Sequence, residues 1–218
     1  MLFASGLRED YLLNIPFQNS INDVSGNYTM IPGDGSTNAP TFVAGRKGTD
    51  YAALFDGTKS IKTNANFVTG TDKVSISLWV KFTATSTGTV IVELGNAAPS
   101  ASNNLFDVVL RSTDAFTFRA KGGVRYAQII LDTWYHFVLV ADLSHPLLGR
   151  KILFYRNGQL IGTQEGPIND TGNFANGILH IGQRGGTTLG FNGYIQDLQI
   201  YNRALSAGEI NRIYNKQK

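Results

Sequence analysis

Paired carboxylates would be the clearest sign of chemistry in this chain, because glycosidic hydrolysis needs two of them facing one cleft. The chain has only four glutamates, Glu9, Glu93, Glu165 and Glu209. None has a second carboxylate two or four residues away on a strand, and the adjacent Glu9 and Asp10 would face opposite sides of one. The sequence therefore predicts no enzymatic activity, unless carboxylates of two different strands lie within about 5–10 Å of each other.

Histidine and phosphate-loop chemistry are also poorly supported. His136, His145 and His180 are too widely spaced for a helical zinc motif or a local catalytic triad. For His136 no activating partner can be named, which favours a structural or cleft-lining histidine over a catalytic base. The glycine-containing segment 182–186 lacks the lysine and the following helix of a phosphate-binding loop.

Sugar binding would need aromatic faces for stacking and planar polar side chains to read hydroxyl groups. Most aromatic residues fall at inward strand positions and are expected in the core. The better candidates lie in predicted loops, where they could equally form a solvated rim. They are Asn103, Asn104, Arg125, Tyr126, Arg184, Thr187 and Phe191.

Short strands must position these residues. The run Lys73–Phe82 alternates apolar and polar residues with a period of two. An edge strand is predicted over 13–17, and a long irregular connection over 18–50. Further strands are expected at 89–94, 105–111, 115–120, 124–130, 134–142, 151–156, 159–163, 177–182 and 192–201.

Two local signals punctuate this pattern. Asn157-Gly158 predicts a two-residue hairpin turn, because both residues accept positive φ. Ser206 and Glu209 have the spacing of a capping box, and Leu205 and Ile210 that of a hydrophobic staple, so one short helix is expected at the C-terminus.

Composition is consistent with one all-β domain over 1–218. The 218 residues are 42% hydrophobic and include 24 glycines but only six prolines. With no cysteine, disulfides are excluded. The net charge of +3 comes from scattered residues, which argues against nucleic acid as a partner. No apolar run is long enough for membrane insertion, and charges at 8–10 interrupt any signal peptide. We therefore expect a native start at Met1 without an export signal, an engineered start being the alternative.

Five fragments in a fixed order carry a family resemblance. They are Phe55-Asp56-Gly57, Ser75–Val80, Thr133–Val138, Leu153–Gly158 and Gly193–Ser206. Together they resemble the laminin-G-like branch of the concanavalin A-like lectin/glucanase superfamily. The resemblance implies an all-β fold, a two-sheet antiparallel jelly-roll sandwich, with the short C-terminal helix added to it.

The resemblance also implies a structural calcium ion (Ca²⁺). Its ligands would be the side chain of Asp197 and oxygens from Gly57 and the segment near Asp23. Calcium favours several such hard oxygen ligands. The alternative is that Asp23 and Asp56 only stabilise turns, and that Asp197 pairs with a backbone donor.

The function expected from these observations is that of a non-catalytic, lectin-like binding module. It would recognise cell-surface glycans or polysaccharides within an extracellular or virion-surface assembly. The alternative is a structural, decoration or fibre protein of a bacteriophage virion, which would dock onto capsid or fibre proteins without binding sugar. A glycoside hydrolase is the least favoured function. Exposed edge strands also allow a homo-oligomer.

Overall fold

The alternating pattern of Lys73–Phe82 forms the central strand of the first sheet. In the computed structural model this strand is β6, and its inward residues Val74, Ile76, Leu78 and Val80 are fully buried. The structure describes residues 11–33, 39–84, 88–95, 104–110, 115–120, 123–163, 174–175 and 177–218; for 104–105, 115 and 123–126 it describes the backbone alone.

Eight strands make the first sheet, sheet A, on which the C-terminal helix packs. Its order is β13 (Gln159–Thr163), β12 (Ile152–Arg156), β11 (Trp134–Asp142), β6 (Lys73–Phe82), β15 (Asn192–Tyr201), β4 (Tyr51–Asp56) and β3 (Thr41–Ala44), with β1 (Leu13–Ile15) also paired to β15. All these pairings are antiparallel.

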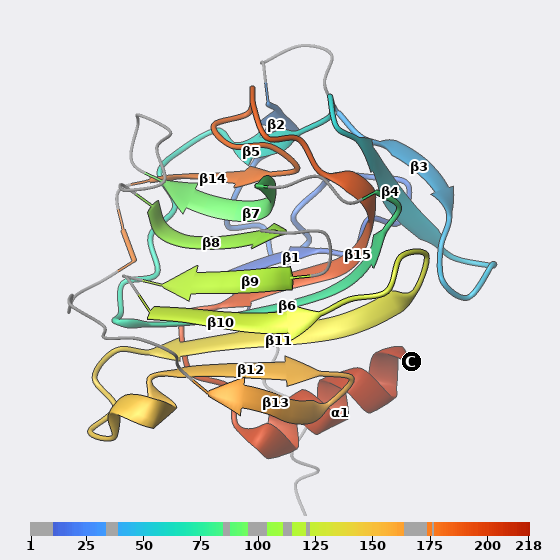
Figure 1. Ribbon diagram of the computed structural model, residues 1–218. Coiled ribbons are helices and arrows are strands. Elements are labelled where there is room, and N and C mark those ends of the chain that lie inside the picture. The colour runs from blue at the N-terminus through green and yellow to red at the C-terminus, as the bar shows by residue number, and fades with distance from the viewer. Residues whose placement is uncertain are drawn as a thin grey trace, which may run out of the picture.

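The second sheet, sheet B, has seven strands and faces sheet A. Its order is β10 (Gly123–Gln128), β9 (Ala115–Ala120), β8 (Asn104–Leu110), β7 (Thr89–Gly95), β14 (Ile178–Ile181), β5 (Ile61–Thr63) and β2 (Met30–Pro32). Figure 1 shows the strands of sheet B in front of those of sheet A. The predicted two-sheet antiparallel jelly-roll sandwich is confirmed.

Aromatic side chains from both sheets fill the space between them. Phe116 of sheet B stacks on Phe137 of sheet A with ring centroids 4.5 Å apart, and contacts Phe82 and Phe154 at 5.5 and 5.6 Å. All four rings are fully buried. Such packed aromatic surface is the main source of stability in a sandwich of this kind.

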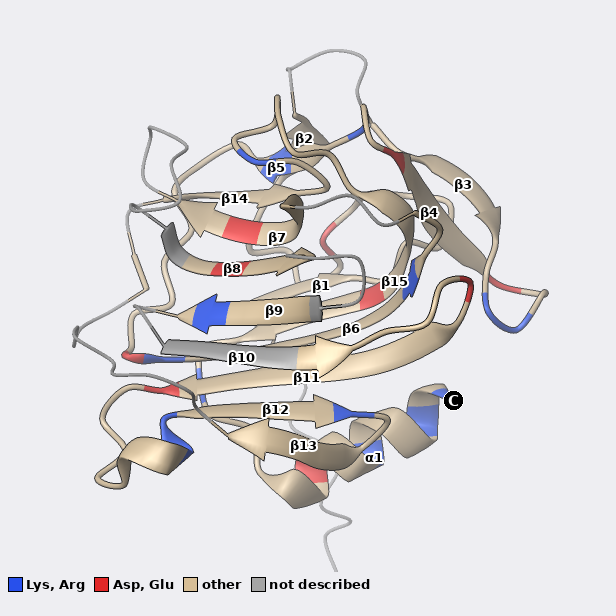
Figure 2. Ribbon diagram, viewed as in Figure 1, with Lys and Arg blue, Asp and Glu red and all other residues tan. Residues whose placement is uncertain are grey.

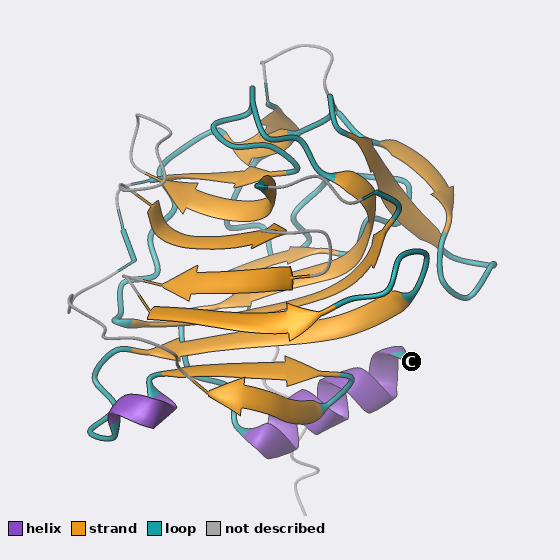
Figure 3. Ribbon diagram, in the orientation of Figure 1, coloured by secondary structure: helices purple, strands orange, loops and turns teal. Residues whose placement is uncertain are grey.

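The predicted hairpin turn and helix are both present (Figure 3). Asn157 and Gly158 have φ of 51° and 80° between β12 and β13. Helix α1 (Ala207–Gln217) begins with the full capping box of Ser206 and Glu209. A 3₁₀ turn, η1 (Leu148–Arg150), precedes β12. Within the described residues, no helix is long and apolar enough to cross a bilayer.

The prediction of an irregular connection over 18–50 is wrong for two short strands, β2 and β3. Both strands lie at sheet edges. The side chains of β3 are exposed or half-buried, so this strand shows no alternation of apolar and polar residues in the sequence. The predicted first strand also ends early, at Ile15, because Phe17 adopts a φ of 58°.

Candidate functional site

A bulge in β15 opens the outer face of sheet A. The first half of β15 pairs with β4 through Ile195, and the second half pairs with β1 from Leu198. Between them the register to β6 shifts, and Asp197 adopts a φ of 52°. A bulge leaves its extra residue outside the ladder and re-aims the side chain. The carboxylate of Asp197 is therefore available to residues above the sheet.

The turn between β3 and β4 supplies the partner of this carboxylate. Nη2 of Arg46 lies 3.0 Å from Oδ2 of Asp197, and the Arg46 side chain is only 7% exposed. The guanidinium group also stacks over Trp79, 4.1 Å from the ring centroid. Arg46 is thus held between an aromatic face and a carboxylate, an arrangement that suits its planar group.

The same turn is tied to β15 by a second polar link. Nε2 of Gln196 donates to Asp50 at 2.6 Å, and its Oε1 accepts from the backbone of Arg46 at 3.3 Å. Gly45 allows this close approach, since a Cβ there would stand 2.5 Å from Oδ1 of Asp50. The turn between β3 and β4 is therefore fixed to the bulge by hydrogen bonds.

Helix α1 forms the opposite wall. The indole of Trp79 donates to Oε1 of Gln217 at 3.0 Å, and its ring stacks on Tyr214 at 5.9 Å. Ile210 and Ile213 are buried with Val138 and Val140 of β11. Figure 1 shows α1 beside β12 and β13.

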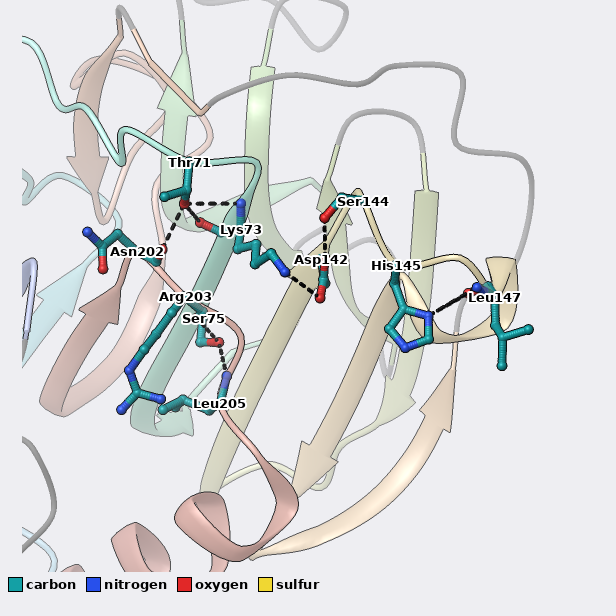
Figure 4. A network of polar contacts seen from close by, with 10 residues as sticks. All are labelled: Thr71, Lys73, Ser75, Asp142, Ser144, His145, Leu147, Asn202, Arg203 and Leu205. Atoms are coloured by element: carbon teal, nitrogen blue, oxygen red, sulfur yellow. Dashed lines mark hydrogen bonds and ion pairs between the residues drawn. The ribbon is translucent and has the colours of Figure 1, made fainter.

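The connection before α1 is fixed by a network at the other end of the sheet (Figure 4). The hydroxyl of Ser75 donates to the carbonyl of Arg203 at 2.8 Å and accepts from the backbone of Leu205 at 3.0 Å. Oγ1 of Thr71 donates to the carbonyl of Asn202 at 2.7 Å. These bonds set the start of the helix, and so the position of its C-terminal end.

These elements enclose a groove of about 430 Å³, which we call the bulge groove. Its volume lies in the usual range of ligand sites. Most of its side chains are planar and polar. The lining residues are Tyr11, Asn14, Pro16, Gln18, Arg46, Lys47, Asp50, Gln196, Asp197, Gln199, Lys216 and Gln217.

The floor of the bulge groove holds a perturbed carboxyl group. Burial raises the pKa of Asp197, and the nearby charge of Asp50 acts in the same direction, while the bond to Arg46 and its charge oppose them. Asp197 is therefore held as part of an ion pair in a largely desolvated position, where removing either partner would be costly.

A second cluster of charge lies on the outer face of sheet B. Glu93, Asp107 and Arg119 are cross-strand neighbours on β7, β8 and β9. Figure 2 shows acidic segments on β7 and β8 and a basic one on β9. Nε of Arg119 lies 2.7 Å from Asp107, and Arg184 reaches Glu93 at 2.8 Å and Asp107 at 3.3 Å.

This cluster brings carboxylates of two different strands side by side, which is the case that the sequence left open for a glycosidase. Directly opposed residues have Cβ atoms about 4.5–5.5 Å apart. However, Glu93 and Asp107 are 1% and 0% exposed, and guanidinium groups engage both of them. Because both carboxylates are buried in ion pairs with arginine, this pair does not have the accessible arrangement that general acid–base catalysis requires.

The residues that the sequence predicted to bind glycan lie in several different environments in the structure. Arg184 is used in the buried ion pairs, and Thr187 is exposed in a turn where its N–H donates to the carbonyl of Arg184 at 3.1 Å. Phe191 is corrected to a core residue, 1% exposed, because its ring packs against Phe55 and Phe82.

The structure describes the remaining predicted glycan-binding residues only in part. Asn103 lies outside the described residues, and Asn104 begins β8. The backbones of Arg125 and Tyr126 pair with Phe118 and Thr117 in β10. The bulge-groove residues were missed, because Asn14, Arg46, Gln196 and Gln217 are far apart in sequence and no local motif joins them.

The three predicted calcium ligands have other partners in the structure. Asp23 accepts hydrogen bonds from Asn14, Ser25 and Tyr28, as in the alternative turn interpretation. Asp197 pairs with Arg46, and Gly57 lies beside Phe191 at the other end of β15. Among the described residues, no group of three or more metal-ligating side chains converges. Calcium binding stays a prediction, without an assembled site.

Two of the three histidines are held in the neutral form, His136 fully buried and His180 half-buried. Burial, with a smaller effect of Arg46, lowers the pKa of His136 to about 3, and Nε2 of His136 lies 2.9 Å from the hydroxyl of Ser77. Burial, assisted by Lys62, lowers the pKa of His180 to about 4. His145 lies in the turn after β11, where Nδ1 contacts the backbone of Leu147 (Figure 4).

We expect His136 to make the protein less stable as the pH falls. Its folded pKa of about 3 is below the unfolded value of about 6.5, so the unfolded state binds more protons between these values. The contribution of His136 to stability therefore falls with pH across this window, by about 2 kcal/mol between pH 6.5 and pH 5. Denaturant titrations at pH 7 and pH 5 measure this loss. It should shrink by about that amount in His136→Gln and stay unchanged in His145→Gln; an equal loss in wild type and His136→Gln would contradict the assignment.

The comparisons with known proteins agree with this architecture. Residues 55–211 match the family model described as the concanavalin A-like lectin/glucanases superfamily, a laminin-G type. Because the match spans well over half of the chain, the protein belongs to this superfamily. A search of curated protein sequences found no match.

Several solved structures share this fold. Domain 4 of the extracellular arabinanase AbnA from Geobacillus stearothermophilus, solved with arabinotriose, aligns with a TM-score of 0.68 at 20% identity, over 94% of this chain and 98% of that one. The ligand-binding domain of botulinum neurotoxin serotype D, solved with N-acetylneuraminic acid, aligns with a TM-score of 0.69 at 16% identity, over 95% and 51%. The binding domain of Paraclostridial mosquitocidal protein 1 gives 0.66 at 16%, over 95% and 52%.

The extent of these matches limits what they show. This chain spans almost the whole arabinanase domain but about half the length of the toxin binding domains. At such identities the likeness establishes the fold alone. The protein thus has a lectin-like fold, shared with modules that bind ligands in larger proteins.

Proposed function

We propose that this protein is a non-catalytic carbohydrate-binding module whose ligand lies in the bulge groove. The observation that carries the proposal is the lining of the groove, in which planar amide, carboxylate and guanidinium side chains surround a volume of about 430 Å³ beside Tyr11. Planar polar groups next to an aromatic ring suit the hydroxyl pattern of a sugar. The buried ion pairs of sheet B support binding over hydrolysis.

The groove can be tested with two rim residues. Lys47→Ala combined with Gln217→Ala removes two donors, and we expect glycan affinity to fall about tenfold or more. The matched control combines Lys151→Ala with Gln159→Ala, beside η1 and on β13, and should bind like wild type. A glycan array followed by titration calorimetry measures both, and thermal melts verify that each variant is folded.

The array should be run with added calcium and with chelator. Loss of binding with chelator would support a calcium site at or beneath the groove, a prediction that the structure leaves without an assembled ligand set. Absence of binding to every glycan would contradict the proposal. It would favour the protein-docking function of a virion component instead, together with a location on a virion surface.

A further inference from the structure

The bulge groove uses most of its hydrogen-bond acceptors internally. Both carboxylate oxygens of Asp50 accept, from the backbone of Lys47 at 3.1 Å and from Gln196 at 2.6 Å. Oδ2 of Asp197 accepts from Arg46. Oε1 of Gln18 accepts from the backbone of Tyr51 at 3.1 Å, and Oε1 of Gln196 from that of Arg46. Each of these oxygens thus already accepts a hydrogen bond before any ligand arrives.

The amide of Gln217 is oriented in the same way. The indole N–H of Trp79 can only donate, so its 3.0 Å contact must be made with Oε1 of Gln217. Gln199 likewise accepts from the hydroxyl of Tyr201 through Oε1 at 3.1 Å. The NH₂ groups of Gln199 and Gln217, for which the described part of the chain provides no partner, remain as donors in the groove lining.

Positive charge adds to this donor surplus. The groove is lined by the cations Arg46, Lys47 and Lys216 and by the carboxylates Asp50 and Asp197. Counted over the described residues that line the groove, three positive charges stand against two negative ones, and this balance has the same sign as the net charge of +3. In Figure 2 the C-terminal end of α1 and the turn between β3 and β4 both carry basic residues.

A sugar hydroxyl and an anionic substituent differ in what they require. A hydroxyl group must donate its proton as well as accept, whereas a carboxylate or sulfate only accepts. Where most acceptors already accept a hydrogen bond and donors are in surplus, a hydroxyl proton must compete for the few acceptor positions that are left, so a buried hydroxyl is bound less favourably than an anion. The anionic group is satisfied by the same lining and is attracted by its charge.

We infer that the bulge groove binds saccharides carrying an anionic, acceptor-only group, a uronic-type carboxylate or a sulfate ester. This inference rests on the proposed carbohydrate-binding function and names its ligand class. The amide nitrogens of Gln199 and Gln217 contact the anionic group directly. Lys47 and Lys216 raise its local concentration through charge that salt screens.

The test is a glycan array that contains both acidic and neutral saccharides. The strongest hit is then titrated against the wild-type protein beside its derivative with the carboxylates methyl-esterified or the sulfates removed. We expect the acidic form to bind and the neutralised form to lose about tenfold or more. Whether the strongest hit carries a carboxylate or a sulfate ester shows which of the two anionic groups the groove binds. Polyglutamate serves as a polyanion that is not a saccharide, and binding of equal strength to it would overturn the inference.

An isosteric charge change gives an independent test. Gln217→Glu keeps an oxygen for the indole of Trp79 but places a negative charge in the groove, so affinity for the acidic hit should fall at least about tenfold. Gln159→Glu on exposed β13 makes the same charge change away from the groove and should have no effect. Thermal melts verify that both variants are folded.

The outcomes separate the two proposals. A neutral saccharide as the strongest hit, bound equally by wild type and Gln217→Glu, would overturn the inference and leave the carbohydrate-binding function standing. No saccharide bound at all would overturn both.

Discussion

Replacing Asp107 with alanine should lower the free energy of unfolding by about 3–5 kcal/mol. Its carboxylate is fully buried and accepts from both Arg119 and Arg184. Without it, two largely buried guanidinium groups face each other across a site with one negative charge fewer. Removing one member of a buried pair costs more than the pair contributes, because the remaining charge stays desolvated. Urea titrations followed by circular dichroism measure the change.

Asp142→Ala is the matched control. Asp142 also pairs with a cation, Lys73, at 3.1 Å, but the lysine side chain is 37% exposed. A partly exposed pair of this kind contributes about 0–1 kcal/mol. The prediction for Asp107 is wrong if both alanine variants lose similar amounts, since burial would then not govern the cost of breaking the ion pair.

Replacing Trp79 with alanine should also lower the free energy of unfolding by about 3–5 kcal/mol, because a large buried aromatic side chain is removed. Trp79 is 6% exposed and contacts Arg46, His136 and Tyr214. It therefore joins the turn between β3 and β4 to the end of α1, across the sheet. We expect this variant also to lose glycan affinity, because both walls of the bulge groove contact the Trp79 ring.

Two variants separate these contributions. Trp79→Phe keeps an aromatic face for Arg46 but loses the indole bond to Gln217, so it should be markedly more stable than Trp79→Ala. Trp134→Ala removes the other tryptophan, which is only half-buried beside Tyr194 and Lys81, and should cost less. A Trp79→Ala protein within about 1 kcal/mol of wild type would contradict the structural role of this ring.

Local signals explain why much of the fold was predictable. The alternation in Lys73–Phe82, the turn at Asn157-Gly158 and the capping box of Ser206 each depend on residues close together in the chain. The resemblance of five ordered fragments then selected the sandwich. The short strands β2 and β3 were not predictable in this way, because their pairing depends on distant strands rather than on their own side chains.

The sites were less accessible to such reasoning. Arg184 was identified as a candidate, but its role depends on Glu93 and Asp107, which only cross-strand pairing brings together. Phe191 was predicted in a rim loop and lies in the core, because the chain following that loop turns inward before β15.

The sequence alone thus determined the strand periodicity, the hairpin turn and the capped helix, because hydrophobic patterning and backbone preferences act over a few residues. Only the tertiary structure decided where charge is buried and where a groove opens. The bulge at Asp197 changes the neighbours of β15, and it faces a turn about 150 residues earlier in the chain, which carries Arg46. No local sequence pattern marks contacts at such separation, since each partner looks like an ordinary polar residue in its own segment and only the folded sheet brings the two together.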